Sequence, residues 1–423
     1  MKKIIVSAVV AAMALSTTAS ALEDIKVSGQ AKLWYETSDT NKKDIFSNDG
    51  STGEVAFKLG MTGKQGNVGF GTTVYQTSTM GLEGTLVSNT RTDDTNLQGD
   101  GELFVGEAYI TAPLIASTIM KFGKQELNTP LAFTETWNAT PNTFNAAVLV
   151  NNSVDNLTLI GAYVGQGNTN NKNFRTNGDV TTQYFGGAYT IGALYKTDAF
   201  GINVWGYQVN NVGTTGLGWY TTLAPATQDF SVKALWADAE IKAGIVNIGA
   251  LAAYVNTDAN KPATNPTKIG EATSAFALNA DVKAADITFF GAVSTVSEGH
   301  MGVGNTATGG KKSKLPTEGV YTDGLYVAMP GSTAGKLKVS TKLGTTGLAL
   351  QGVMNRNNFD KANRSLVVGS KNRLDTNEVD FIVSQKLGDF DIAAILMNRS
   401  FEDKVEDKAK GGNYVRVVTS VNF

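Results

Sequence analysis

The chain ends on the ten residues Tyr414-Val415-Arg416-Val417-Val418-Thr419-Ser420-Val421-Asn422-Phe423. Alternate side chains of a β-strand point to opposite faces of the sheet. One face of this stretch would carry three valines, a threonine and the terminal Phe423, while the other would carry Arg416 among mostly polar neighbours. The pattern predicts an amphipathic β-strand. A soluble sheet and a membrane barrel both use such strands, so the rest of the chain has to decide between them.

The first 21 residues have the three parts of a secretory signal. Two lysines precede an apolar run from Ile4 to Leu15, and Ala19-Ser20-Ala21 has the small-residue pattern of a cleavage site. The apolar run is shorter than the roughly 20 residues that a membrane-spanning helix needs. We therefore expect residues 1–21 to be a cleaved signal peptide, and residues 22–423 to form a single exported domain.

The composition excludes several classes of site. The 423 residues include no cysteine, which removes disulfides, thiol catalysis and thiolate metal ligands. The single histidine, His300, lies in a glycine-rich stretch that is typical of a loop, so a histidine-dependent catalytic triad would rest on this residue alone. The formal net charge is −2, which gives no sign of a nucleic-acid partner.

Alternation of apolar and polar residues recurs along the chain and predicts many more strands. Clear examples are Ile25 to Glu36, Glu54 to Thr62, Lys336 to Leu343 and Glu378 to Lys386. Short turns alternate with long polar segments, which are Thr79 to Gly101, Gly167 to Thr182, Asn210 to Gln228, Thr257 to Thr273, Ser297 to Gly335 and Asn357 to Asp375. This rhythm is typical of an outer-membrane barrel with short periplasmic turns and long external loops.

Placing strands on this scheme predicts an all-β protein, a transmembrane antiparallel barrel of about 18 strands, with an uncertainty of about two. The predicted strands are centred near residues 31, 58, 73, 107, 121, 148, 161, 189, 205, 235, 250, 278, 291, 339, 351, 381, 395 and 418. A barrel of this size encloses an aqueous channel, whereas an eight-stranded barrel is filled by side chains.

One connection, Glu126 to Asn138, differs from the other long segments because it contains Leu131, Phe133 and Trp137. A loop that folds into the barrel and packs on its wall has a reason to keep such bulky apolar residues. The alternative is that the aromatic residues belong to the girdle at the membrane interface, which is a standard feature of these barrels.

Two segments of the chain resemble the major outer membrane porins of campylobacters and related bacteria. They are Phe122-Gly123-Lys124-Gln125-Glu126-Leu127-Asn128-Thr129-Pro130 and Val150-Asn151-Asn152-Ser153-Val154-Asp155-Asn156-Leu157-Thr158-Leu159. The resemblance also covers the signal and the terminal Phe423, whereas the loops diverge. It implies a homotrimeric general porin of 18 strands, whose third external loop, here Glu126 to Thr143, folds inward to form the eyelet. It also implies that Phe423 is the terminal aromatic residue through which the outer-membrane assembly machinery receives the chain.

Several charged residues are candidates for the narrow part of the channel. Alternation places Lys58, Lys121, Lys338, Arg399, Arg416 and Glu107 on the inner face of their strands. An inward loop would add the carboxylates of Glu126 and Glu135 opposite Lys121, Arg399 and Arg416. Opposed charges across a narrow gap create a transverse field. For each residue, the alternative is an ordinary solvated charge that has no effect on selectivity.

We therefore expect passive diffusion of small hydrophilic solutes and ions through the outer membrane of a Gram-negative bacterium, in contact with its lipid and lipopolysaccharide. Pore radius and lining charges determine which solutes diffuse through such a channel, so no catalytic residue, metal or cofactor is expected. A barrel that only displays loops for structural or adhesive purposes is the alternative, and an outer-membrane enzyme that depends on His300 is a third possibility. Channel conductance separates these functions.

Overall fold

The structure is a computed structural model that describes residues 22–82, 84–88, 102–168, 181–212, 230–258, 270–358, 374–403 and 408–423. The predicted signal peptide, residues 1–21, lies outside this part of the chain. Among the described residues, no helix has the length and apolar character that crossing a membrane requires. The α-helix α2, Gly324–Val327, is only four residues long.

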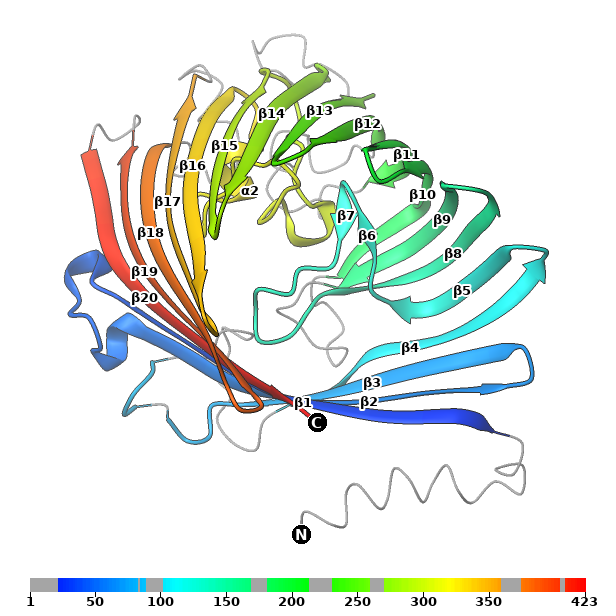
Figure 1. Cartoon of the computed structure of the whole chain (residues 1–423), viewed down its shortest axis with the longest axis horizontal. Coiled ribbons are helices and arrows are strands. Elements are labelled where there is room, and N and C mark those ends of the chain that lie inside the picture. Colours follow the sequence, from blue (N-terminus) through cyan, green and yellow to red (C-terminus); the bar gives the residue numbers. More distant parts are fainter. Residues whose placement is uncertain are drawn as a thin grey trace.

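Eighteen antiparallel strands form one closed sheet, which confirms the predicted fold class (Figure 1). Each strand pairs with its neighbours in the chain, and β1 also pairs with β20. The barrel strands are β1 (Glu23–Ser38), β2 (Ser51–Gln65), β3 (Val68–Ser78), β4 (Glu102–Ile115), β5 (Thr118–Gln125), β8 (Thr143–Val154), β9 (Leu157–Asn168), β10 (Thr181–Lys196), β11 (Phe200–Val212), β12 (Phe230–Ala243), β13 (Val246–Thr257), β14 (Thr273–Ala284), β15 (Ile287–Val296), β16 (Ser332–Leu343), β17 (Thr346–Asn357), β18 (Leu374–Leu387), β19 (Phe390–Asp403) and β20 (Lys408–Asn422). All the centres that the sequence predicted fall inside these strands.

The two faces of the wall differ as the alternation predicted. Large apolar side chains point outward and are exposed, such as Ile191 on β10 and Leu337 on β16. Side chains of the opposite parity point inward, and many are buried, including Trp34 on β1 and Trp236 on β12. Because side chains alternate with a period of two, only one register turns the apolar side chains outward and the others inward. A slip by one residue would move every side chain to the opposite face.

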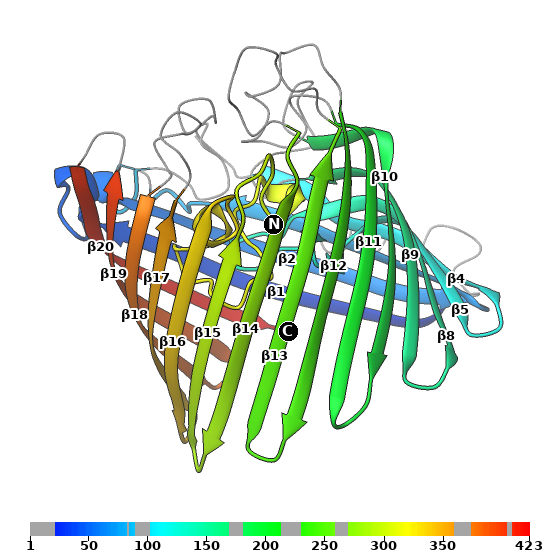
Figure 2. The ribbon, with the colours of Figure 1, turned by 90° about the horizontal axis from the view of Figure 1, so that it is seen from above.

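The connections differ in length between the two ends of the barrel, and Figure 2 shows tight hairpins at one end. Several of these turns contain a residue with a positive φ, for example Gly66, Asn156 and Gly388. Two-residue hairpins favour such backbone angles because they match the twist of the flanking strands. One longer connection, residues 39–50, was not predicted, and it contains the short 3-10 helices η2 (Thr40–Lys42) and η3 (Asn48–Gly50).

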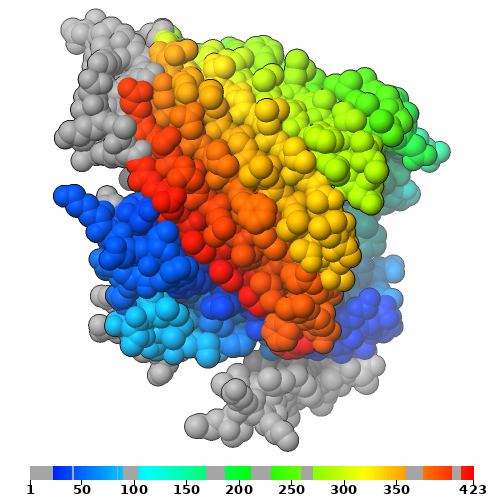
Figure 3. Space-filling model, turned by 60° about the vertical axis from the view of Figure 1, so that its left-hand side comes forward, coloured from blue at the N-terminus to red at the C-terminus, as the bar shows by residue number. Residues whose placement is uncertain are grey.

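The last strand closes the barrel against the first, and Figure 3 shows the red C-terminal strand beside the blue N-terminal strands. The backbone N–H of Gly29 donates to the carbonyl of Phe423 at 2.7 Å, and the N–H of Phe423 donates to the carbonyl of Gly29 at 3.0 Å. A Cβ atom on Gly29 would lie 2.1 Å from the Phe423 ring. The absence of a side chain at Gly29 therefore makes room for the terminal aromatic ring.

This seam predicts that Gly29→Leu and Phe423→Asp both reduce the fraction of folded barrel. The leucine overpacks the seam, at a cost of about 1–3 kcal/mol, and the aspartate places a charge where the ring packs. The measurement is the heat-modifiable mobility of the refolded protein on gels. Phe46→Asp is the control, because Phe46 is an exposed loop residue and its substitution should leave the folded fraction unchanged. Wild-type folding of both seam variants would contradict the prediction.

Candidate functional site

The connection between β5 and β8, residues 126–142, crosses the interior of the barrel and is called loop 3 here (Figure 1). It contains a small hairpin, β6 (Asn128–Thr129) and β7 (Ala132–Phe133). Near its start, the N–H of Leu131 lies 3.4 Å from the hydroxyl of Tyr207 on β11. Near its end, the ammonium group of Lys32 on β1 donates to the carbonyls of Thr136, at 3.0 Å, and Asn138. Loop 3 therefore spans the interior between two distant parts of the wall, as an inward-folded loop must.

Apolar contacts hold loop 3 on both sides of the barrel. Leu131 packs in a cluster with Trp205 and Trp236, which point inward from β11 and β12. At the other side, Ala139 packs on Trp34, and the partly buried Trp137 packs against the same group. These bulky residues thus lie inside the barrel and not in an interfacial girdle.

The connection between β15 and β16, residues 297–331, also folds inward and is called loop 7 here. This differs from the prediction, which treated the segment Ser297 to Gly335 as an external polar loop. Met301, Val303, Leu315 and Val327 of loop 7 are buried in the cluster around Leu131. These apolar residues are irregularly spaced among glycine, threonine and lysine residues, so they form no periodic pattern that sequence reasoning could detect.

His300 anchors the start of loop 7. Its side chain is 3% exposed, its backbone N–H donates to the carbonyl of Glu271 at 2.9 Å, and its ring Nδ1 lies 2.8 Å from the Thr257 hydroxyl. The ring packs against Phe230, with 5.4 Å between ring centroids. Burial lowers the pKa of His300 to about 4, so the imidazole is neutral at physiological pH.

A carboxylate from β18 holds the middle of loop 7. Both oxygens of Glu378, which is 1% exposed, accept hydrogen bonds from the backbone of this loop. The N–H groups of Val320, Tyr321 and Thr322 donate to it at 2.6, 3.1 and 2.5 Å, and the Thr322 hydroxyl donates at 2.9 Å. Charge-assisted bonds of this kind are about twice as strong as neutral ones. Glu378 is therefore a main attachment of loop 7 to the wall.

Glu135 joins the two loops, and this differs from the prediction that its carboxylate faces the channel. The side chain is 2% exposed. One oxygen accepts from the Asn305 amide of loop 7 at 2.9 Å and from the Thr308 hydroxyl, and the other accepts from the Trp137 indole at 2.8 Å. The reason is that loop 7 occupies the space that Glu135 was expected to face.

Two arginines on the inner wall are also largely enclosed. Arg416 on β20 donates to Glu36 at 2.7 Å and lies 4.9 Å from the ring centroid of Tyr321, whose hydroxyl also donates to Glu36. Arg399 on β19 lies 4.3 Å from the ring centroid of Tyr326. Both residues point inward, as predicted. Both are covered by loop 7, so they do not directly face Glu126.

A second group of predicted residues meets on the wall formed by β2 to β5, where loop 3 begins. Lys121 and Glu107 are 3.9 Å apart and keep exposed side-chain fractions of 29% and 15%. Lys121 also lies 3.7 Å from the ring centroid of Tyr109. The backbone N–H of Glu126 donates to Glu107 at 3.4 Å, and the Glu126 side chain is exposed. Reduced hydration inside the barrel and the charge of Glu107 raise the pKa of Glu126 although its side chain stays accessible, while Lys58 and Lys121 act in the opposite direction.

Lys58 and Lys338 remain partly exposed on the inner wall. Lys58 lies 5.8 Å from the ring centroid of Tyr75, next to the Lys121 group. Lys338 pairs with Gln351 across β16 and β17, on a separate part of the wall. The structure therefore brings Lys58, Glu107, Lys121 and Glu126 together, and leaves Lys338 apart from them.

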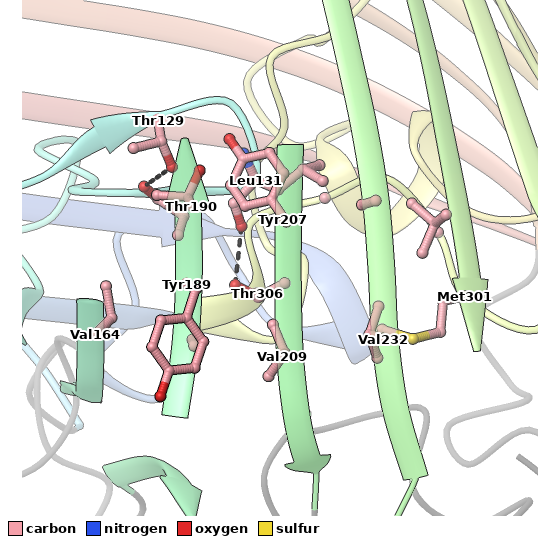
Figure 4. Close-up of a pocket in the computed structure, with 16 residues that line it drawn as sticks. Thr129, Leu131, Val164, Tyr189, Thr190, Tyr207, Val209, Val232, Met301 and Thr306 are labelled. Atoms are coloured by element: carbon pink, nitrogen blue, oxygen red, sulfur yellow. Dashed lines mark hydrogen bonds between the residues drawn. The ribbon is translucent and has the colours of Figure 1, made fainter. Parts of the chain in front are cut away.

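The two loops and the wall enclose a small apolar pocket of about 60 Å³ (Figure 4). Leu131 comes from loop 3, Met301 and Thr306 come from loop 7, and Tyr207 and Val232 come from the wall. The Thr306 hydroxyl donates to the carbonyl of Leu131 at 2.8 Å. This packing fills one side of the interior, so the space left for solutes lies outside this cluster.

The anchor at Glu378 predicts that Glu378→Ala loosens loop 7. The substitution leaves three buried or partly buried amide groups without this acceptor, at a cost of up to about 1–3 kcal/mol each. We expect a larger and noisier single-channel conductance in planar bilayers. Asp391→Ala is the matched control, since it removes an exposed carboxylate of the same inner wall. An unchanged current from Glu378→Ala would show that this anchor does not hold the loop.

Two buried carboxyl groups of loop 7 predict a dependence on pH. Burial raises the pKa of Glu318 to about 8 and that of Asp323 to about 6, although Lys312 acts in the opposite direction on both. Both pKa values are higher than those of exposed carboxyl groups, so at neutral pH the folded loop binds more protons than the unfolded chain. Its stability is therefore highest in acid and falls as the pH rises to about 8.

We expect more frequent current fluctuations at pH 9 than at pH 5, and a weaker dependence in Glu318→Gln. Asp389→Asn in an exposed turn is the control, and it should keep the wild-type profile. Fluctuations that are equally frequent at both pH values would contradict the assignment.

The architecture was compared with known proteins. No family model and no curated protein matches the sequence. Solved structures do match the fold. Acinetobacter baumannii OccAB3 has a TM-score of 0.67 at 14% identity, over 95% of this chain and 99% of that chain. Pseudomonas aeruginosa OpdK, crystallised with vanillate, has a TM-score of 0.66 at 13% identity, over 95% and 98%. Pseudomonas aeruginosa OpdO has a TM-score of 0.65 at 13% identity, over 96% and 98%. At these identities the likeness concerns the fold, and it extends over nearly the whole of each chain.

Proposed function

We propose that the protein is an outer-membrane porin through which small hydrophilic solutes and ions diffuse passively. The observation that carries this proposal is the pair of inward loops, which narrow an 18-stranded barrel while charged groups at the start of loop 3 stay exposed. A barrel of this size has room for an aqueous channel. The similar structures OccAB3, OpdK and OpdO share this fold over nearly their whole length, and OpdK was crystallised with the small solute vanillate, which supports a solute channel here.

Membrane insertion follows from the outward face of the barrel. Exposed apolar residues such as Phe276, Leu278 and Val293 form this face, and the closed sheet leaves no unpaired edge in the hydrocarbon. The polar residues Lys233, Asn256 and Arg356 lie on the same outward face of β12, β13 and β17, nearer the long-loop end. We place this end at the external surface, where lipopolysaccharide surrounds the barrel.

Selectivity arises from the accessible and partly accessible charges near the start of loop 3. Glu107 and Glu126 supply negative charge there, and Lys58 and Lys121 supply positive charge. Low-dielectric walls strengthen the field between such groups relative to bulk water. Dipolar solutes can align in this field, whereas apolar solutes have to displace ordered water.

The sequence resemblance to campylobacter-type major porins supports two further proposals. One is a homotrimer, and the other is recognition of Phe423 by the outer-membrane assembly machinery. Phe423 is 74% exposed on the outside of the barrel although its backbone is paired in the seam. An exposed terminal ring on a paired strand remains accessible to a receptor.

Conductance measurements test the proposed function and separate the two loop-3 glutamates. Wild-type protein should form ion-conducting channels in planar bilayers. Glu126→Gln should shift the reversal potential in a salt gradient away from cation preference with little change in conductance, because it removes an exposed charge. Glu135→Gln should instead raise the conductance, since it weakens the attachment of loop 3 to loop 7.

Asp389→Asn, in an exposed turn, is the control for both measurements. A folded wild-type barrel that conducts no ions would overturn the proposed function and favour a barrel that only displays loops. Identical effects of the two glutamate substitutions would show that the distinction between an exposed and a buried carboxylate is wrong.

A further inference from the structure

A polar niche of about 390 Å³ lies under the two inward loops, on the side of the short turns. Asn128 and Pro130 of loop 3 and Lys314 and Pro316 of loop 7 form its roof. Its wall comes from the inner faces of β10 to β14, and includes Asn203, Trp205, Trp236, Asp238, Glu240 and Asn279. This volume is within the range of small-molecule sites. None of the loop-3 charges discussed above, Glu126 included, lines it.

Asp238 places an uncompensated negative charge on the wall of the niche. Its two oxygens accept from the Asn203 amide at 2.7 Å and from the Trp236 indole at 2.8 Å. Both donors are neutral, so they orient the carboxylate without neutralising it. No lysine or arginine in the described part of the chain forms an ion pair with Asp238. The neighbouring Glu240 differs, because Lys196 and Lys242 lie 3.8 and 4.0 Å from it.

Lys314 places a positive charge on the roof, and Glu318 and Glu135 act on it only from beyond ion-pair distance. Its ammonium group donates to the Asn128 amide oxygen at 2.9 Å and lies 4.2 Å from the ring centroid of Phe133. These contacts also orient the charged group without neutralising it. Within the described residues, no carboxylate lies within ion-pair distance of Lys314. The niche therefore has one oriented anion and one oriented cation that line the same space without contacting each other.

We propose that this niche binds small zwitterionic solutes, with their ammonium group toward Asp238 and their anionic group toward Lys314. Such a solute satisfies both fixed charges at once, whereas a singly charged solute leaves one of them unmatched. The fixed hydrogen bonds of Asn203, Trp236 and Asn128 reduce the ordering that binding requires, which favours affinity. The inference rests on the proposed function, because it places a binding site on the path that solutes take through the barrel.

Binding is tested by titration calorimetry on the folded full-length mature barrel in detergent. The probe is 6-aminohexanoate, and the comparison solutes are hexanoate and hexylamine, which each keep one of its charges. The zwitterion should bind at least about tenfold more tightly than either comparison solute. Asp238→Asn and Lys314→Gln should each remove most of this advantage. Equal affinity for all three solutes would overturn the proposal.

Asp281→Asn is the matched control. It removes another carboxylate that accepts from a neutral asparagine amide, that of Asn247, on the same inner wall outside the niche. This variant should keep the wild-type preference. Heat-modifiable mobility on gels checks that each variant folds. Lys314→Gln alters loop 7 and leaves β12, the strand of Asp238, unchanged, so the two variants test the niche independently. Loss of the preference in Asp281→Asn, or its retention in both niche variants, would overturn the assignment.

Conductance of the same preparation separates the two proposals. A barrel that conducts ions without preferring the zwitterion would contradict the niche and leave the porin function standing. A barrel that prefers the zwitterion but conducts nothing would support the niche and contradict diffusion through the barrel.

Discussion

Closure of one continuous hydrogen-bonded sheet is the constraint on which this structure depends. Backbone groups in hydrocarbon need partners within the protein, so a sheet with open edges is not viable there. The reciprocal bonds between Gly29 and Phe423 complete the ring at the point where the chain ends. Once the ring is closed, the period of two fixes which side chains face inward. The positions of Glu36, Glu378 and Arg416 follow from that parity.

Carboxylates perform two different tasks inside the barrel. Glu36, Glu135 and Glu378 are almost completely buried. Glu135 and Glu378 hold the inward loops through several hydrogen bonds each, and Glu36 accepts one from Tyr321 of loop 7. Glu126 stays exposed, and Asp238 is only partly covered. A buried carboxylate that accepts several donors stabilises a loop path, whereas an accessible one contributes to the field inside the barrel. Counting acidic residues in the interior would therefore overestimate the negative field in the open part of the barrel.

The sequence predicted the barrel well because each strand carries its own signal. Alternation, short turns and polar loops located all 18 strands, and bulky residues identified loop 3 as unusual. The same reasoning missed the inward path of loop 7 and the burial of Glu135. Both depend on contacts such as that between Glu135 and Asn305, which are 170 residues apart in the chain. No local pattern encodes such a contact, so the division between buried and exposed charges required the structure.

Glu378 holds loop 7 mainly through main-chain N–H groups, and this has a consequence for sequence drift. Any residue except proline can supply a backbone donor, so substitutions at Val320 and Tyr321 can preserve this attachment. The anchor instead depends on one carboxylate in a strand and on the course of the loop backbone. The side chains of this segment can therefore diversify while the loop backbone keeps the same course inside the barrel.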